Sequence, residues 1–96
     1  MSIKLNIDKS VLGDSEGDVV AEVSGKTVGE CLNYMVKQQP TLKKSIFDKN
    51  GNLYPDNLIR VNGKYVLSKD RKFIPSKAVA KSVKNGDEIE IIKWRC

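Results

Sequence analysis

Residues 25–40 read GKTVGECLNYMVKQQP and decide the fold, because they contain one amphipathic helix together with both of its boundaries. Thr27 and Glu30 have the spacing of a capping box, in which the hydroxyl accepts from an early helical amide and the carboxylate returns to the amide of Thr27. Apolar residues then recur at helical spacing, and they are Val28, Cys31, Leu32, Met35 and Val36. Pro40 forbids continuation, so we expect a helix after Thr27 that packs through one face.

The residues before this helix predict two strands joined as a hairpin. Residues 2–7 alternate polar and apolar side chains, which is typical of a strand with one buried face. Residues 13–18, GDSEGD, tolerate turn geometry, and the alternation resumes over residues 19–23. The helix can therefore pack on a hairpin that precedes it.

The residues after the helix predict a second hairpin and a last strand. Residues 58–61 and 64–67 flank Asn62-Gly63, a dipeptide that readily supplies the two positive φ angles of a type I′ turn. Residues 88–94 alternate again, which gives a last strand with one solvated face. Shorter patterns predict single helical turns within residues 42–47 and 75–80, and a turn at residues 85–87.

Length and composition limit the possible functions. A chain of 96 residues with 40% hydrophobic and 30% charged content builds one core, so residues 1–96 form a single globular domain. No apolar run is long enough for a bilayer and residues 1–7 are not signal-like, so we expect a cytoplasmic protein without a membrane partner. With no His and only two Cys, the usual zinc and Cys-His sites are excluded. We expect neither an enzyme nor a bound cofactor.

Charge is unevenly distributed along the chain. Residues 1–36 contain 3 basic and 6 acidic side chains, whereas residues 37–96 contain 14 and 6. This basic later segment could attract nucleic acid or an acidic protein, although a surface kept basic for solubility is the plainer explanation. The aromatic residues Tyr54, Tyr65, Phe73 and Trp94 form no stacking motif with adjacent basic residues, so nucleic acid is the weaker of the two partners.

The order strand, strand, helix, hairpin, strand predicts an α+β chain with a β-grasp fold, in which a mixed four- to five-stranded sheet packs on one main helix. Residues 25–32, 59–63 and 85–92 resemble the three signature segments of the MoaD/ThiS family, the ubiquitin-like sulfur carriers that include the small subunit of molybdopterin synthase. The segments occur in the family's order, and the resemblance extends from Ile3 to Ile92. It implies a protein of the sulfur-carrier class, or a divergent descendant, that serves sulfur transfer or molybdopterin- or thiamin-type cofactor biosynthesis.

The same resemblance implies a partner and a site. The partner would be an adenylating, ubiquitin-activating-like enzyme or a cofactor-synthase large subunit. In the family, a tail that ends in Gly-Gly becomes an acyl-adenylate and then a thiocarboxylate; here the sequence reads KWRC at residues 93–96, so we expect the fold and docking face without the diglycine chemistry.

Three interpretations of the tentative carrier tail, Trp94, Arg95 and Cys96, remain open. Trp94 could simply pack over the end of the sheet beside an inert Cys96. Cys96 could instead carry sulfur, with Arg95 favouring its thiolate and the terminal carboxylate opposing it. The third interpretation is an interaction module without carrier activity, which binds RNA or a protein through its sheet face and basic surface. Cys31, in contrast, is expected in the core.

Overall fold

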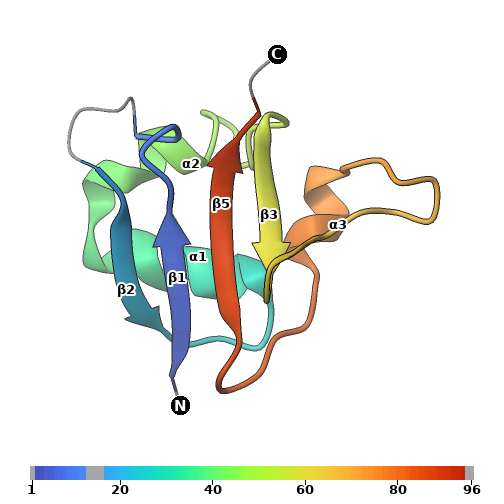
Figure 1. Ribbon diagram of the computed structural model, residues 1–96. Helices are drawn as coiled ribbons and strands as arrows, with labels where there is room; N and C mark the ends of the chain where they lie inside the picture. The colour runs from blue at the N-terminus through green and yellow to red at the C-terminus, as the bar shows by residue number, and fades with distance from the viewer. Residues whose placement is uncertain (1, 13–16, 95–96) are drawn as a thin grey trace.

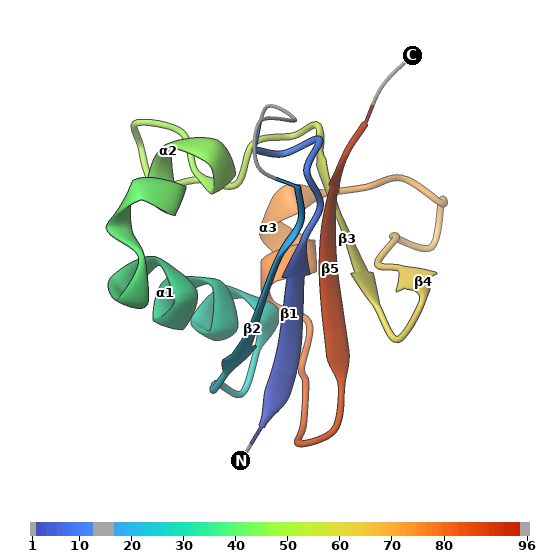
Figure 2. The same ribbon diagram turned by 60° about the vertical axis from the view of Figure 1, so that its left-hand side comes forward.

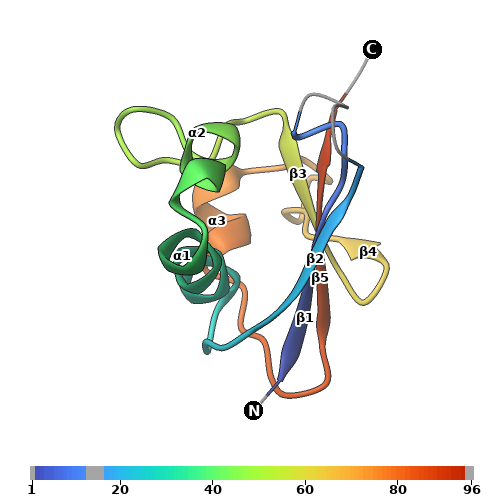
Figure 3. The same cartoon turned by 90° about the vertical axis from the view of Figure 1, so that its left-hand side faces the viewer.

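The computed structural model describes residues 2–12 and 17–94 as a five-stranded sheet with its helices on one face (Figures 1 and 3). The strands are β1 (Ile3–Ile7), β2 (Val19–Val23), β3 (Asn57–Val61), β4 (Lys64–Tyr65) and β5 (Glu88–Lys93). The helices are α1 (Val28–Gln38), the 3-10 turn η1 (Pro40–Leu42), α2 (Lys43–Ile46) and α3 (Pro75–Val79). This arrangement confirms the predicted α+β β-grasp fold with one main helix.

The strand order β2-β1-β5-β3-β4 makes the sheet mixed. β1 is antiparallel to β2 and parallel to β5, and β5 is antiparallel to β3. The parallel register places Leu5 opposite Ile89 and Ile7 opposite Ile91. The first and last strands therefore form the centre of the sheet, while β4 lies at its edge (Figure 2).

The core lies between α1 and the covered face of the sheet. The helix buries Val28, Cys31, Leu32 and Met35, as its apolar periodicity predicts, whereas Val36 is half-buried at the margin. Facing them is a buried set from the three central strands, namely Ile3, Leu5, Ile7, Ile59, Ile89 and Ile91. Each such side chain contributes about 1.5–3 kcal/mol through loss of contact with water, so this layer accounts for most of the stability.

The start of α1 differs in one detail from the predicted capping box. The Thr27 hydroxyl accepts from the Glu30 amide at 3.2 Å, as expected, but the Glu30 carboxylate accepts from the amide of Lys26 at 3.1 Å. Thr27 itself has an extended backbone and forms a bridge with Ser82. The capping carboxylate thus reaches one residue further back than predicted, and the start of the helix is tied to the segment that precedes β5.

The predicted type I′ turn at Asn62-Gly63 is confirmed, but β4 is shorter than predicted. Asn62 and Gly63 have φ of 53° and 83°, as a type I′ turn requires. β4 ends at Tyr65, although the Val66 amide still donates to the Ile59 carbonyl at 3.0 Å. The chain then turns within residues 68–72. The expected strand over residues 64–67 is therefore reduced to a short edge.

Buried polar contact joins the helical layer to the sheet at one end. Asn57, the first residue of β3, is buried, and its side-chain amide donates to the carbonyls of Ser45 at 3.0 Å and Ile46 at 3.3 Å. These carbonyls lie at the end of α2, where no further helical amide follows to donate to them.

Within residues 2–12 and 17–94, no helix combines the length and apolar character needed to cross a bilayer.

Candidate functional site

The face of the sheet opposite the helices is the candidate site, and we call it the open face (Figure 3). Register places one residue from each strand in a single row across it. This row, in sheet order, is Val20, Asn6, Glu90, Arg60 and Tyr65. Because alternate residues of a strand point to opposite faces, the same strands that build the core also present this row to solvent.

Arg60 is held between its two neighbours in the row, Glu90 and Tyr65. Its Nη2 donates to Glu90 Oε2 at 2.8 Å, and its guanidinium carbon lies 5.5 Å from the centre of the Tyr65 ring. The hydrogen bond to Glu90 raises the pKa of Arg60, so the guanidinium stays charged. The two side chains are 29% and 26% exposed, and such a pair contributes only about 0–1 kcal/mol to stability. The pair orients Arg60 more than it stabilises the fold.

Two polar atoms of this row have no hydrogen-bond partner among the described residues. They are the donor Nε of Arg60 and the acceptor Oδ1 of Asn6. Both atoms are inaccessible to solvent, although other atoms of these side chains are exposed. Buried polar atoms are nearly always satisfied where stability alone governs a region. The row therefore carries polar capacity that the fold does not use.

Apolar side chains surround the polar centre of the open face. Leu58 and Ile92 face each other as half-buried neighbours on β3 and β5. At the two ends of the row, Val20 is 53% and Tyr65 is 45% exposed. Arg and Tyr are among the residues enriched in protein interfaces. The open face is suited to bind a protein rather than a small molecule.

The structure places only part of the predicted carrier tail. Trp94 directly follows β5, its backbone amide donates to the Asp56 carbonyl at 2.6 Å, and the residue is 59% exposed. Arg95 and Cys96 lie outside the described residues, so the tail remains a prediction. Cys31 is buried, and desolvation raises the pKa of its thiol, which confirms its assignment to the core.

The sequence analysis missed Asn6, Arg60 and Glu90. A two-residue turn at Asn62-Gly63 already pairs Arg60 with Tyr65, so that contact could have been found from the turn. Glu90 required the sheet order, which no local pattern supplies. Across the described parts of the chain, no group of three His, Cys, Asp or Glu side chains could hold a metal ion.

Comparison with known proteins gives structural matches alone. No family model and no curated protein sequence matches the chain. The crystal structure of SAMP1 from Haloferax volcanii matches with a TM-score of 0.72 and 22% identity, covering 99% of this chain and 97% of that one. CysO from Mycobacterium tuberculosis matches with a TM-score of 0.63 and 17% identity, covering 95% of this chain and 99% of CysO.

A third match is a chain of the BexX/CysO complex from Amycolatopsis orientalis, with a TM-score of 0.61 and 19% identity, covering 96% of this chain and 97% of that one. At these identities the likeness establishes the fold. The chain therefore has, over nearly its whole length, the β-grasp fold of the small archaeal modifier SAMP1 and of CysO, which is the fold that its resemblance to the MoaD/ThiS carriers implies.

Proposed function

We propose that this chain is a small protein of the MoaD/ThiS sulfur-carrier class, or a divergent descendant, that acts as a non-catalytic partner in sulfur transfer or in molybdopterin- or thiamin-type cofactor biosynthesis in the cytoplasm. The observation that carries the proposal is the fold likeness to SAMP1 and CysO along nearly the whole chain. The three sequence segments that resemble the carriers support it independently, because they were identified without the structure.

The partner we propose is an adenylating, ubiquitin-activating-like enzyme or the large subunit of a cofactor synthase. The open face is its docking surface, and Arg60 is the central contact because Glu90 and Tyr65 already hold it in place. A preordered side chain loses less conformational freedom on binding than a mobile one. A chain of this fold also occurs in the BexX/CysO complex, which supports a role in protein association.

Docking is tested by charge reversal on the open face. Arg60→Glu should weaken binding to the cognate adenylating enzyme by about ten-fold or more, measured by isothermal titration calorimetry. Lys49→Glu makes the same charge change in the exposed loop after α2 and serves as the matched control. Arg60→Met removes the charge without placing a second carboxylate beside Glu90. Unchanged affinity in both Arg60 variants would exclude the open face as the docking surface.

The carrier role has a separate test. The purified chain is incubated with the adenylating enzyme, ATP and a sulfide donor, and its intact mass is measured. A carrier gains an adenylyl group, with pyrophosphate released, or exchanges one carboxylate oxygen for sulfur as AMP leaves. A persulfide on the Cys96 thiol would need a sulfane-sulfur donor, such as polysulfide, in place of sulfide, and Cys96→Ser would abolish the mass gain by that route alone. An unchanged mass, together with retained binding, would reject the carrier role and favour an interaction module without sulfur chemistry.

A further inference from the structure

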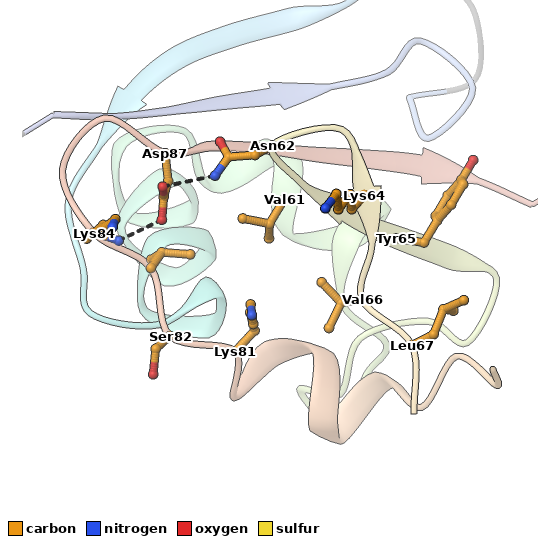
Figure 4. A pocket seen from close by; sticks show the side chains of 11 residues that line it. Val61, Asn62, Lys64, Tyr65, Val66, Leu67, Lys81, Ser82, Lys84 and Asp87 are labelled. Carbon is orange, nitrogen blue, oxygen red and sulfur yellow. Dashed lines mark hydrogen bonds between the residues drawn. The ribbon is translucent and has the colours of Figure 1, made fainter. Parts of the chain in front are cut away.

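A second surface, which shares Tyr65 with the open-face row, lies beside the β3–β4 hairpin. A groove of about 760 Å³ runs between the hairpin, with the two residues that follow it, and residues 81–84, which lead toward β5. Figure 4 shows Val61 and Val66 on the hairpin side of this space and Lys81 and Ser82 on the other. We call it the hairpin groove.

The floor of the hairpin groove is aliphatic. Val61 is nearly buried, Val66 and Val83 are half-buried, and Leu67 is 46% exposed at the end of the groove. These side chains continue the apolar core outward to the surface. An exposed aliphatic strip of this kind is suited to contact the aliphatic side chains of a partner.

The rim of the hairpin groove is basic. It carries Lys64, Lys81 and Lys84, and its single acidic residue is Asp87. The Asp87 carboxylate is already engaged, since it accepts from the Asn62 side chain at 3.0 Å and from the Lys84 amide at 2.9 Å. Between described residues, the one ion pair within 4.0 Å is that of Arg60 with Glu90, so the three ammonium groups make none. They remain available to an acidic ligand.

The edge of the sheet adds a third feature. β4 pairs with β3 on one side and has no strand neighbour on the other among the described residues. An unpaired strand edge can pair with an extended peptide, but this edge is only two residues long, so its backbone contribution is small. Aliphatic and cationic side chains therefore supply most of the contacts that the groove offers.

We propose that the hairpin groove binds an extended acidic peptide segment of a partner protein, with aliphatic residues on the floor and carboxylates against Lys64, Lys81 and Lys84. Nucleic acid fits less well, because the floor is aliphatic and the one aromatic side chain, Tyr65, packs against Arg60. This binding is independent of the proposed carrier role, since it uses neither the tail nor Glu90.

The test uses a fluorescein-labelled peptide in which a Val-Ile-Val core is flanked on each side by glutamates. We expect saturable binding by fluorescence polarisation, weakened by added salt, with amide shifts in nitrogen-15 NMR spectra centred on residues 64–67 and 82–84. A peptide with serines in place of the aliphatic core, and one with lysines in place of the glutamates, should each bind at least about ten-fold more weakly.

Variants locate the site. Lys81→Glu with Lys84→Glu should weaken binding about ten-fold or more, whereas Lys43→Glu with Lys49→Glu makes the same charge change on and after α2 and should leave it unchanged. Leu67→Ser tests the floor at a position exposed enough to spare folding. Equal binding by the two double variants, or no saturable binding at low salt, would overturn the proposal.

Two further outcomes would overturn the acidic-peptide proposal, because each would show that the hairpin groove binds a different ligand. Tighter binding of oligouridylate than of the acidic peptide, lost in the Lys81 and Lys84 variant, would assign the groove to nucleic acid. A concentration-dependent dimer that the same variant abolishes would assign it to a second copy of this chain.

Discussion

The two faces of the sheet are made by the same strands but differ in almost every property. The covered face presents Ile89 and Ile91 of β5 to the core, and both side chains are fully buried. The open face presents Glu90 and Ile92 of the same strand, one in an ion pair and the other half-buried. Adjacent residues thus lie in the core and on the proposed docking surface in turn, and substitutions one position apart should separate the two roles.

The largest effect should come from adjacent isoleucines. Ile91→Ala removes a buried side chain and leaves a cavity, so it should lower the free energy of unfolding by about 2–5 kcal/mol. Ile92→Ala on the open face should lower it by about 1 kcal/mol, because that side chain is already partly in water. Urea unfolding followed by circular dichroism measures both. Equal losses would show that the open face is as closely packed as the covered one.

A smaller effect should come from the polar contact at the end of the covered face. Asn57→Ala removes the donor to the Ser45 carbonyl, while the Ile46 carbonyl keeps the Tyr54 amide at 3.3 Å, and this loss should cost about 1–3 kcal/mol. Asn52→Ala, in the exposed loop after α2, is the matched control and should change the free energy of unfolding by less than about 0.5 kcal/mol. If thermal unfolding shows no difference between them, α2 is not held by this amide.

The start of the covering helix should show an effect of about 1 kcal/mol. Thr27→Ala removes the hydroxyl that accepts from the Glu30 amide. Thr41→Ala makes the same change at an exposed position in η1 and should be nearly neutral. Urea unfolding compares the two variants. A Thr27 variant as stable as the Thr41 variant would mean that the bridge to Ser82 and the hydrogen bond between Glu30 and Lys26 fix the start of α1 without the hydroxyl.

The smallest expected effect on stability concerns Asp87, in the turn before β5, and should appear only at acidic pH. Hydrogen bonds from the Asn62 side chain and the Lys84 amide lower the pKa of Asp87 below its ordinary value of 3.8. The unfolded chain therefore takes up this proton first, so the contribution of Asp87 is complete above 3.8 and is lost as the pH falls through the lower folded pKa.

Asp87→Asn should consequently make stability less dependent on pH below 3.8. Asp70→Asn removes the same charge in the loop at residues 69–72 and is the control. Thermal unfolding recorded from neutral pH down into this acidic range provides the measurement. Parallel profiles for the parent chain and the Asp87 variant would count against the shift.

The elements that could be predicted from sequence are those whose signals are local. Thr27 and Pro40 lie next to the two ends of α1 and so mark its boundaries locally. Asn62-Gly63 fixes the hairpin because both of its strands adjoin the turn. The capping box was predicted with one wrong partner, because its spacing does not show whether the Glu30 carboxylate accepts from Thr27 or from Lys26, as it does here. β4 is shorter than the predicted strand over residues 64–67, because no local sequence pattern shows at which residue the chain stops pairing with β3.

The candidate sites depended on contacts between distant residues and were largely beyond the sequence. Arg60 and Glu90 are thirty positions apart and meet only because β5 lies between β1 and β3. The hairpin groove likewise joins residues 61–67 to residues 81–84. The uneven charge along the sequence indicated a basic later segment. It did not show that Lys64, Lys81 and Lys84 lie around the same aliphatic groove.

The parallel pairing of β1 with β5 has a consequence for biosynthesis. A nascent chain that has not yet exposed residues 88–93 outside the ribosome lacks the strand that fills the space between β1 and β3. Until then the sheet exists only as two separate pairs of strands, β1 with β2 and β3 with β4, and no strand connects the two pairs. Completion of the sheet must therefore wait until residues 88–93 have left the ribosome, and before that point chaperones have access to the unjoined parts.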